Sequence, residues 1–379
     1  MKIVELKTYL VNCGGRNWLY VKVCTDEEVE GVGEAYSVGP DEATAAVIHD
    51  FESWLVGRNP MDIERLWQMM YNFSRFPGGS VVNSAISGIE QALWDVVGKS
   101  CGMPVYNLLG GRCRDKVRVY THVGGRTVDE LVENAVKTVK EGYTAIKMPP
   151  QPPGSHLMRR QRLCKEVEAR VEAVREAVGD DIDICLDAHA KIFEPAEAAA
   201  IGQAVEEYKP LFLEEPLRPE NIDALAKLSS HLNVPIATGE QLYTKFQFRE
   251  LLEKQAADII QPDICCAGGL LETKKIAAMA EAYYVSVAPH NPMSPVATVA
   301  NVHLAASLPN FLILEYIPDN KPPRSEVIKD PLQVKDGYIV PPSEAGLGIE
   351  LNEKALNERP PKSWHRNFIF KEDGSVALI

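Results

Sequence analysis

The chain has 379 residues, of which 45% are hydrophobic and 25% are charged, and its formal net charge is −13. These proportions are ordinary for a soluble globular protein, and the length suits a large α/β domain with a smaller companion. The acidic balance argues against a nucleic-acid partner or an anionic membrane surface. An anionic substrate stays open, because a metal ion or a lysine inside a cleft inverts the local field.

Cysteine spacing and the first residues of the chain further limit the classes of protein to which the sequence can belong. The 8 cysteines include no C-x-x-C pair, so a zinc or redox motif has no support. The chain begins with strand-like alternation from Met1 to Val11, without the apolar core of a signal peptide. No apolar stretch approaches the ~18 residues that span a bilayer. We therefore expect a cytoplasmic protein with no membrane partner.

Residues 1–116 are predicted to form a small α+β domain. Strand-like alternation comes first, with a flexible glycine-containing loop at 13–17, and helical periodicity follows. Three strands followed by helices are typical of an α+β unit. The predicted elements are strands at 2–11, 18–24 and 30–35 and helices at 41–55, 60–71 and 84–99.

From about residue 117 the pattern alternates between strand and helix, which implies a parallel sheet. Eight such strands favour a closed (β/α) barrel over residues 117–330. An open doubly wound sheet is the alternative, but no G-x-G-x-x-G turn follows the first strand. Residues 331–379 lose the repeat and are expected to pack back on the first domain. The predicted strands are 117–122, 145–148, 183–187, 211–215, 235–238, 259–263, 285–288 and 311–315.

Ionisable residues stand at the ends of the later strands of this predicted barrel. The carboxyl ends of barrel strands surround one mouth, where barrel enzymes have their active sites. Burying many polar groups at one mouth without a partner is costly in free energy. This cost favours a functional site over the alternative that each residue only caps a helix. The residues are Lys147, Asp187, His189, Glu214, Glu240, Asp263, His290 and Glu315.

Three of these residues, Asp187, Glu214 and Glu240, end successive strands and supply hard oxygen ligands. Such a set suits Mg²⁺, which keeps part of its water and leaves room for substrate oxygens. Without a cation, adjacent carboxylates repel one another and some stay protonated. Salt bridges to a barrel lysine or arginine are the alternative role. Glu215 should point the other way along its strand and is interpreted as structural.

His290 and Asp263 end neighbouring strands, so the carboxylate is placed to hydrogen-bond one imidazole nitrogen. Such a contact fixes the tautomer of the histidine and raises its basicity, which predicts a general base. A histidine held in a loop for structural reasons is the alternative interpretation.

Taken together, seven segments resemble the enolase superfamily, specifically its mandelate racemase-like group, over essentially the whole chain. The resemblance implies an N-terminal capping domain over a modified TIM-type barrel, Mg²⁺ on the three carboxylates, and a His290–Asp263 dyad as base. The shared step removes the proton next to a carboxylate and stabilises the resulting enediolate. A homo-oligomer is implied as well. The segments are IEQALWD at 89–95, LDAH at 186–189, LEEP at 213–216, TGEQ at 238–241, QPD at 261–263, APHNP at 288–292 and LE at 314–315.

The end of the second barrel strand bears on the type of reaction. Racemases of this group carry Lys-x-Lys there, whereas Pro149 stands in place of the second lysine. A lysine–histidine pair of bases therefore lacks one base. Lys147 is interpreted as a partner of the substrate carboxylate, with an ion pair at the barrel mouth as the alternative. His189, two residues after Asp187, is expected to face the barrel interior and to help a hydroxyl leave as water.

This pattern resembles the galactonate dehydratase family and related sugar-acid dehydratases. It implies Mg²⁺-dependent conversion of an aldonate, such as galactonate or gluconate, to a 2-keto-3-deoxy acid. Glu315 is expected to hydrogen-bond the intermediate in its protonated form. An epimerase or cycloisomerase with the same enediolate is the alternative reaction. A non-catalytic scaffold is the alternative class, although every named position holds a competent residue type.

The small-molecule substrate is expected to be recognised outside these strand ends. Arg16 and Trp18 near the N-terminal loop, together with Asn291 beside the base, are the candidate contacts. The segment 149–162 is interpreted as a loop and the solvated first turn of a helix. A basic contact to the substrate is its alternative role.

Overall fold

A computed structural model describes residues 1–37, 39–363 and 368–378 of the chain. The N-terminal part contains an antiparallel sheet in the order β1-β2-β3, covered by helices. The third strand lies very close to helix α3, and a Cβ atom on Gly33 would stand 2.2 Å from the carbonyl oxygen of Gly88. The glycines of β3 therefore permit this packing. The elements are β1 Ile3–Asn12, β2 Asn17–Thr25, β3 Glu30–Ala35, α1 Asp41–Leu55, α2 Ile63–Phe73, α3 Gly79–Cys101 and α4 Val105–Leu108.

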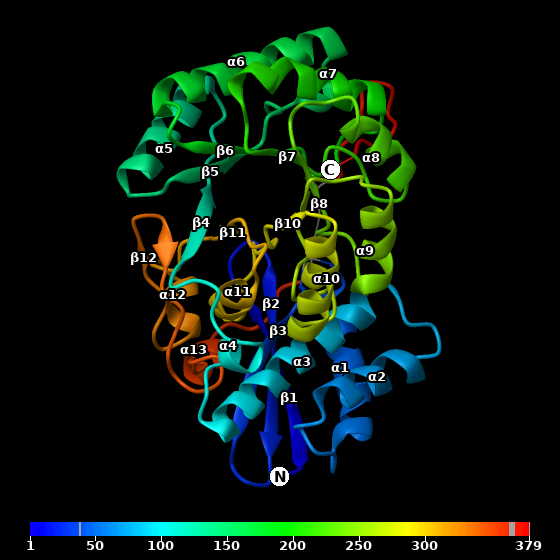
Figure 1. Cartoon of the computed structure of the whole chain (residues 1–379), viewed down its shortest axis with the longest axis vertical. Helices are drawn as coiled ribbons and strands as arrows, with labels where there is room; N and C mark the ends of the chain where they lie inside the picture. Colours follow the sequence, from blue (N-terminus) through cyan, green and yellow to red (C-terminus); the bar gives the residue numbers. More distant parts are fainter. Residues whose placement is uncertain (38, 364–367, 379) are drawn as a thin grey trace.

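The second part is the predicted barrel, with helices around it (Figure 1). Parallel strands run in the order β4 to β10, and β11 pairs with β4. A bridge between Val287 and Phe311 joins β10 to the chain just before β11 and closes the ring. All eight predicted strands are present, and five are shorter than predicted. They are β4 Val117–His122, β5 Ala145–Met148, β6 Asp183–Asp187, β7 Phe212–Glu214, β8 Ile236–Thr238, β9 Ile259–Ile260, β10 Ser286–Val287 and β11 Leu314–Glu315.

Helices connect these strands as the alternating pattern predicted. They bury apolar faces against the barrel in one large hydrophobic core that also takes in residues of β1, β2 and β3. None of the helices in the described ranges is long and apolar enough to cross a bilayer. The helical elements are α5 Val128–Lys140, η1 Ser155–Leu157, α6 Arg160–Val178, α7 Pro195–Val205, η2 Glu206–Tyr208, α8 Ile222–Ser229, α9 Thr244–Glu253, α10 Leu270–Ala282 and α11 Pro295–Ser307.

The inside of the barrel is filled by one layer of side chains, with one residue from each strand or its immediate flank. Because side chains alternate along a strand, the residue two positions further on points inward again, nearer the mouth. This regularity places the functional side chains. The layer consists of Tyr120, Ala145, Cys185, Phe212, Ala237, Ile259, Ala288 and Ile313.

The last part of the chain touches both domains. A hairpin of β12 (Val334–Lys335) and β13 (Tyr338–Ile339) adds to β4 at the edge of the barrel. The short helix α13 (Glu353–Asn357) packs near β1, and its Glu353 pairs with Lys22 of β2. Ile369 and Leu378 instead line a cavity together with barrel loops. The domain boundaries after residues 116 and 330 remain predictions.

Candidate active site

The strand ends bring most of the predicted residues to one mouth of the barrel. Lys147, Asp187, Glu214 and Glu315 each follow an inward residue of the filled layer by two positions, and so does His290. All five residues are buried, and each exposes at most 6% of its surface. The predicted convergence is thus observed for these residues.

The ammonium group of Lys147 stands at the centre of the cluster. Its Nζ lies 2.9 Å from Asp187 Oδ2, 2.9 Å from Glu214 Oε1 and 2.7 Å from Glu315 Oε1. Burial disfavours the charged amine, but the three carboxylates outweigh it and hold the pKa of Lys147 well above its usual value. This geometry corresponds to the ion pair that the sequence left as the alternative role for this lysine.

The three predicted metal ligands lie within electrostatic reach of one another. Burial, and next the charge of Asp187, raise the pKa of Glu214 to about 8. Asp187 also contributes to raising the pKa of Glu240 to about 7, after burial as the main cause. Among the described residues, however, no three acidic, histidine or cysteine side chains already surround one point as a metal cage. Glu240 faces His290, whereas the other two carboxylates face Lys147.

The donor set nevertheless fits a divalent cation. Glu214 Oε2 is buried and has no hydrogen-bond partner among the described residues, and an unpaired buried carboxylate oxygen is costly. A cation, the Lys147 ammonium, already contacts the other oxygen of Glu214. Carboxylate oxygens of this kind are the ligands that Mg²⁺ prefers. Glu215, by contrast, accepts hydrogen bonds from Thr238 Oγ1 and Gly239 N and is fully paired, as its structural assignment requires.

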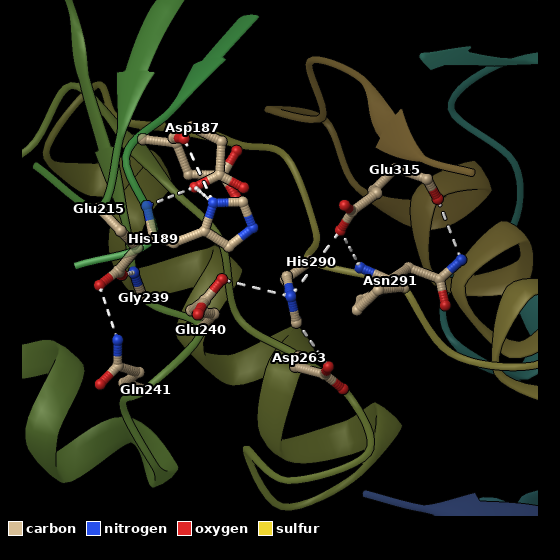
Figure 2. A network of polar contacts seen from close by, with 12 residues as sticks. Asp187, His189, Glu215, Gly239, Glu240, Gln241, Asp263, His290, Asn291 and Glu315 are labelled. Atoms are coloured by element: carbon tan, nitrogen blue, oxygen red, sulfur yellow. Dashed lines mark hydrogen bonds and ion pairs between the residues drawn. The ribbon is translucent and has the colours of Figure 1, made fainter. Parts of the chain in front are cut away.

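His290 and Asp263 form the predicted pair (Figure 2). The Nδ1 of His290 lies 2.8 Å from Asp263 Oδ2, and its Nε2 lies 3.3 Å from Glu240 Oε2. Asp263 also accepts a hydrogen bond from Cys265 N, which fixes its orientation. Burial opposes the imidazolium form, but Glu240, Glu315 and Asp263 together raise the pKa of His290 to about 10. Glu240 is the largest of these raising charges, so a cation bound to it would lower the pKa of His290 and favour the neutral imidazole that can accept a proton.

His189 lies above Glu240 in the view of Figure 2, and His290 lies to the right of Glu240. Its position differs from the one expected by strand alternation, because β6 ends at Asp187 and the chain turns there. His189 has a left-handed φ of 53°, its N–H donates to Asp187 Oδ1 at 2.8 Å, and its side chain is 48% exposed. Burial lowers the pKa of His189, against the pull of Asp187. The ring therefore lies at the mouth beside the acids and not inside the barrel.

Glu315 differs from its predicted protonated form. Burial favours the neutral acid, but Lys147, His290 and His122 outweigh it and hold the pKa of Glu315 well below its usual range. The carboxylate also accepts the N–H of Asn291 at 2.7 Å. The predicted role assumed only acidic neighbours, whereas the structure surrounds this residue with cationic and hydrogen-bonding groups.

His122 is a site residue that the sequence interpretation missed. Its Nε2 contacts Glu315 Oε1 at the end of β4, and its side chain is 39% exposed. A signal was available, because His122 follows the inward Tyr120 by two positions, as Lys147 follows Ala145.

The three candidate substrate contacts have different surroundings. Trp18 lies in β2 and not in the loop, and it is 3% exposed in the hydrophobic core. A contact between Trp18 and the substrate therefore stays a prediction. Asn291 is fully buried, and its Nδ2 donates to Thr298 Oγ1 and Glu315 O. Arg16 donates to Pro292 O, two residues after His290.

The N-terminal domain holds the loops that carry the His290–Asp263 pair. Glu34 of β3 accepts hydrogen bonds from Ser294 N and Ala297 N at the start of α11. Gln91 of α3 donates to the carbonyl of Ile264, the residue next to Asp263. These contacts place the N-terminal domain against the mouth beside β9 and β10.

Comparison with known proteins agrees with this geometry. The profile of the mandelate racemase / muconate lactonizing enzyme N-terminal domain matches residues 8–110, and the enolase C-terminal domain-like profile matches residues 130–355. The chain is 37% identical to a D-galactonate dehydratase of Variovorax paradoxus over 388 residues, with 100% of both chains covered. A D-galactonate dehydratase of Ralstonia pickettii is 37% identical over 391 residues with the same coverage.

Solved structures give the same result. An enolase from Agrobacterium radiobacter, provisionally assigned as a galactarate dehydratase and solved with sodium and L-malate, has a TM-score of 0.96 and 39% identity over 100% of both chains. A structure from Mesorhizobium loti, provisionally described as a dehydratase, has a TM-score of 0.90 and 38% identity over 95% of this chain and 98% of that one. Matching profiles, relatives and fold agree, and the chain belongs to the mandelate racemase-like group of the enolase superfamily.

Proposed function

We propose that the protein dehydrates a sugar acid to a 2-keto-3-deoxy acid through abstraction of the proton next to the carboxylate. The observation that supports this most directly is the placement of two histidines near one carboxylate cluster. His290 is backed by Asp263 at 2.8 Å, and His189 is anchored on Asp187. The curated relatives act on galactonate, and dehydration is the activity in their names.

Proton abstraction falls to His290 in this proposal. Its Nδ1 is engaged by Asp263, so Nε2 is the nitrogen that faces the mouth and takes the proton from C2. Asp263 then stabilises the imidazolium that forms. Lys147, an ammonium already surrounded by carboxylates, binds the carboxylate end of the substrate through the same kind of charge-assisted contact.

The leaving group is assigned to His189. This imidazole is half exposed at the mouth, where it donates a proton to the hydroxyl on C3 as the C3–O bond breaks. Water leaves, and the resulting enol tautomerises to the 2-keto acid. Asp187, Glu214 and Glu240 would hold Mg²⁺, and the bound ion supplies positive charge that stabilises the developing enediolate. Glu315, as an ionised group next to Lys147, orients the ammonium.

A panel of aldonic and aldaric acids tests the proposal. The enzyme is incubated with Mg²⁺ and each acid, and 2-keto acid is measured as its semicarbazone. At least one member should give keto acid at a rate proportional to enzyme concentration. Exchange of the C2 proton in D₂O without any keto acid would instead indicate the alternative, an epimerase or cycloisomerase that uses the same enediolate. Neither exchange nor keto acid from any member would contradict both.

A further inference from the structure

A cavity of about 370 Å³ adjoins His189 at the mouth of the barrel. It lies between the loop that follows β5 and the segment that follows β6. The end of the chain forms another wall, through Ile369 and Leu378. The cavity thus begins at the residue that we assign to the leaving hydroxyl and extends away from the carboxylate cluster.

Arg170 of α6 lines this cavity and has few partners for a buried charge. The residue is 2% exposed, and Nη2 donates only a long hydrogen bond of 3.4 Å to Gly125 O. Within residues 1–37, 39–363 and 368–378, its Nε is buried without a hydrogen-bond partner. Among the described residues, Arg170 forms no ion pair, although Glu166, one turn earlier, offsets part of its charge. A buried guanidinium without a paired anion is costly, which points to an anionic ligand.

Other partly buried arginines of the chain have partners for their guanidinium groups. Arg118 lies 2.7 Å from Asp183, and Arg175 donates to the carbonyl oxygens of Tyr208, Gly179 and Ile182. Arg170 is more deeply buried than either and lacks such a carboxylate.

A second donor in the cavity wall also lacks an acceptor. The amide Nε2 of Gln151, in the loop after β5, is buried and has no hydrogen-bond partner in the part of the chain that the structure describes. Lys191 and His156 add further donors to the lining, against one acid, Glu197. The wall is thus rich in donors and positively charged, and it complements oxygen atoms that carry negative charge.

We propose that this cavity binds the distal end of the substrate, and that Arg170 and Gln151 bind a terminal carboxylate there. The inference rests on the proposed dehydration, because it places C3 of the substrate at His189 and the rest of the carbon chain beyond it. The preferred substrates are then dicarboxylic sugar acids, which differ from aldonates only in the oxidation state of the far carbon. Arg170 is a specificity-determining residue.

Matched substrates test this directly. Galactarate and galactonate, or glucarate and gluconate, share every centre near the reacting carbons and differ at C6. The parent enzyme should have the higher kcat/KM on the dicarboxylate of the preferred pair. Arg170→Met keeps the volume and removes the charge, so kcat/KM on the dicarboxylate should fall about 10- to 100-fold while the aldonate changes little.

Control variants separate recognition from folding. Arg162→Met removes an exposed guanidinium, 72% exposed, from the same helix and should leave both substrates unaffected. Gln151→Leu should reduce the preference for the dicarboxylate by a smaller factor than Arg170→Met. Arg170→Lys should recover part of the preference, because the charge returns without the forked geometry.

Binding without turnover keeps this inference separate from the proposed reaction. In a His290→Asn background with Mg²⁺, calorimetry should show tighter binding of galactarate than of galactonate, and Arg170→Met should abolish the difference. If no acid is dehydrated by the parent enzyme but this binding difference persists, the reaction fails and the subsite stands. Equal loss on both substrates, or an unchanged preference in Arg170→Met, would overturn the subsite.

Discussion

The buried carboxylates of this protein fall into two groups that are neutralised in different ways. At the barrel mouth, Asp187, Glu214 and Glu315 share one ammonium group, and Glu214 keeps an oxygen without a partner. At the contact between the two domains, Glu34 and Glu90 are as deeply buried but accept backbone N–H groups.

At the contact with the N-terminal domain, the buried carboxylates accept hydrogen bonds on their oxygens. Glu90 accepts from Leu270 N, Leu271 N and Trp94 Nε1, so it caps the start of α10. Burial, as the main cause, raises the pKa of Glu34 and of Glu90 to about 7, while these hydrogen bonds act in the opposite direction. Among the described residues, the unpaired oxygen of Glu214 at the mouth and the paired oxygens at the domain contact distinguish a residue suited to a ligand from residues that hold the fold together.

Replacement of the proposed base should have the largest effect. His290→Asn should lower kcat for keto acid by at least about 100-fold, because a general base contributes on the order of 10²–10⁴. Exchange of the C2 proton in D₂O should fall in parallel. His303→Asn is the matched control, since His303 is also buried but contacts Tyr106 N and Leu347 O away from the mouth. Parental activity in His290→Asn would reject the dyad assignment.

Glu214 and Glu215 are adjacent in the chain, so their variants compare a proposed metal ligand with a residue that supports the fold. Glu214→Gln should raise the Mg²⁺ concentration for half-maximal activity at least about tenfold, since even outer contacts of a metal site contribute 10–100-fold. Glu215→Gln should leave that concentration unchanged and lower the free energy of unfolding by about 1–3 kcal/mol. Metal titrations and urea unfolding measure the two effects. Similar Mg²⁺ titrations for both variants would contradict the assignment of Glu214 to the metal.

Removal of the acids between the domains should affect stability. Glu34→Ala and Glu90→Ala each leave two helix N–H groups without an acceptor, which should lower the free energy of unfolding by about 1–3 kcal/mol. Denaturant unfolding measures this loss. Mg²⁺ dependence should stay parental in both variants, in contrast with Glu214→Gln. A stability equal to that of the parent would show that water replaces these contacts.

The pH dependence of stability gives the smallest and most specific effect. A carboxyl whose pKa is raised to about 7 in the folded protein binds more protons folded than unfolded between its ordinary pKa of 4.5 and pH 7. The contribution of Glu34 and Glu90 to the free energy of unfolding is therefore fully present below pH 4.5, and it is lost as the pH rises to about 7. The double variant Glu34→Gln, Glu90→Gln should flatten this slope in urea unfolding series. An unchanged slope would mean that the hydrogen bonds keep both carboxyls ionised.

Local sequence patterns determined much of this protein. Strand and helix periods predicted the barrel, and polar residues at or near the ends of buried strands predicted the site at its mouth, formed by Lys147, Asp187, Glu214, His290 and Glu315. Alternation is a property of the backbone itself, so it holds wherever a strand continues. It failed at His189 because β6 ends at Asp187 and the chain turns.

Partners across space were decided only by the tertiary structure. Arg170 lies in the middle of a charged helix, where its sequence neighbours suggest solvent, yet packing buries it beside the cavity at His189. Likewise, no local pattern indicates that one lysine will contact three carboxylates or that Glu34 will cap a barrel helix. Charge pairing depends on distances between elements far apart in the chain, and these distances are set by how the barrel closes and how the N-terminal domain packs on it.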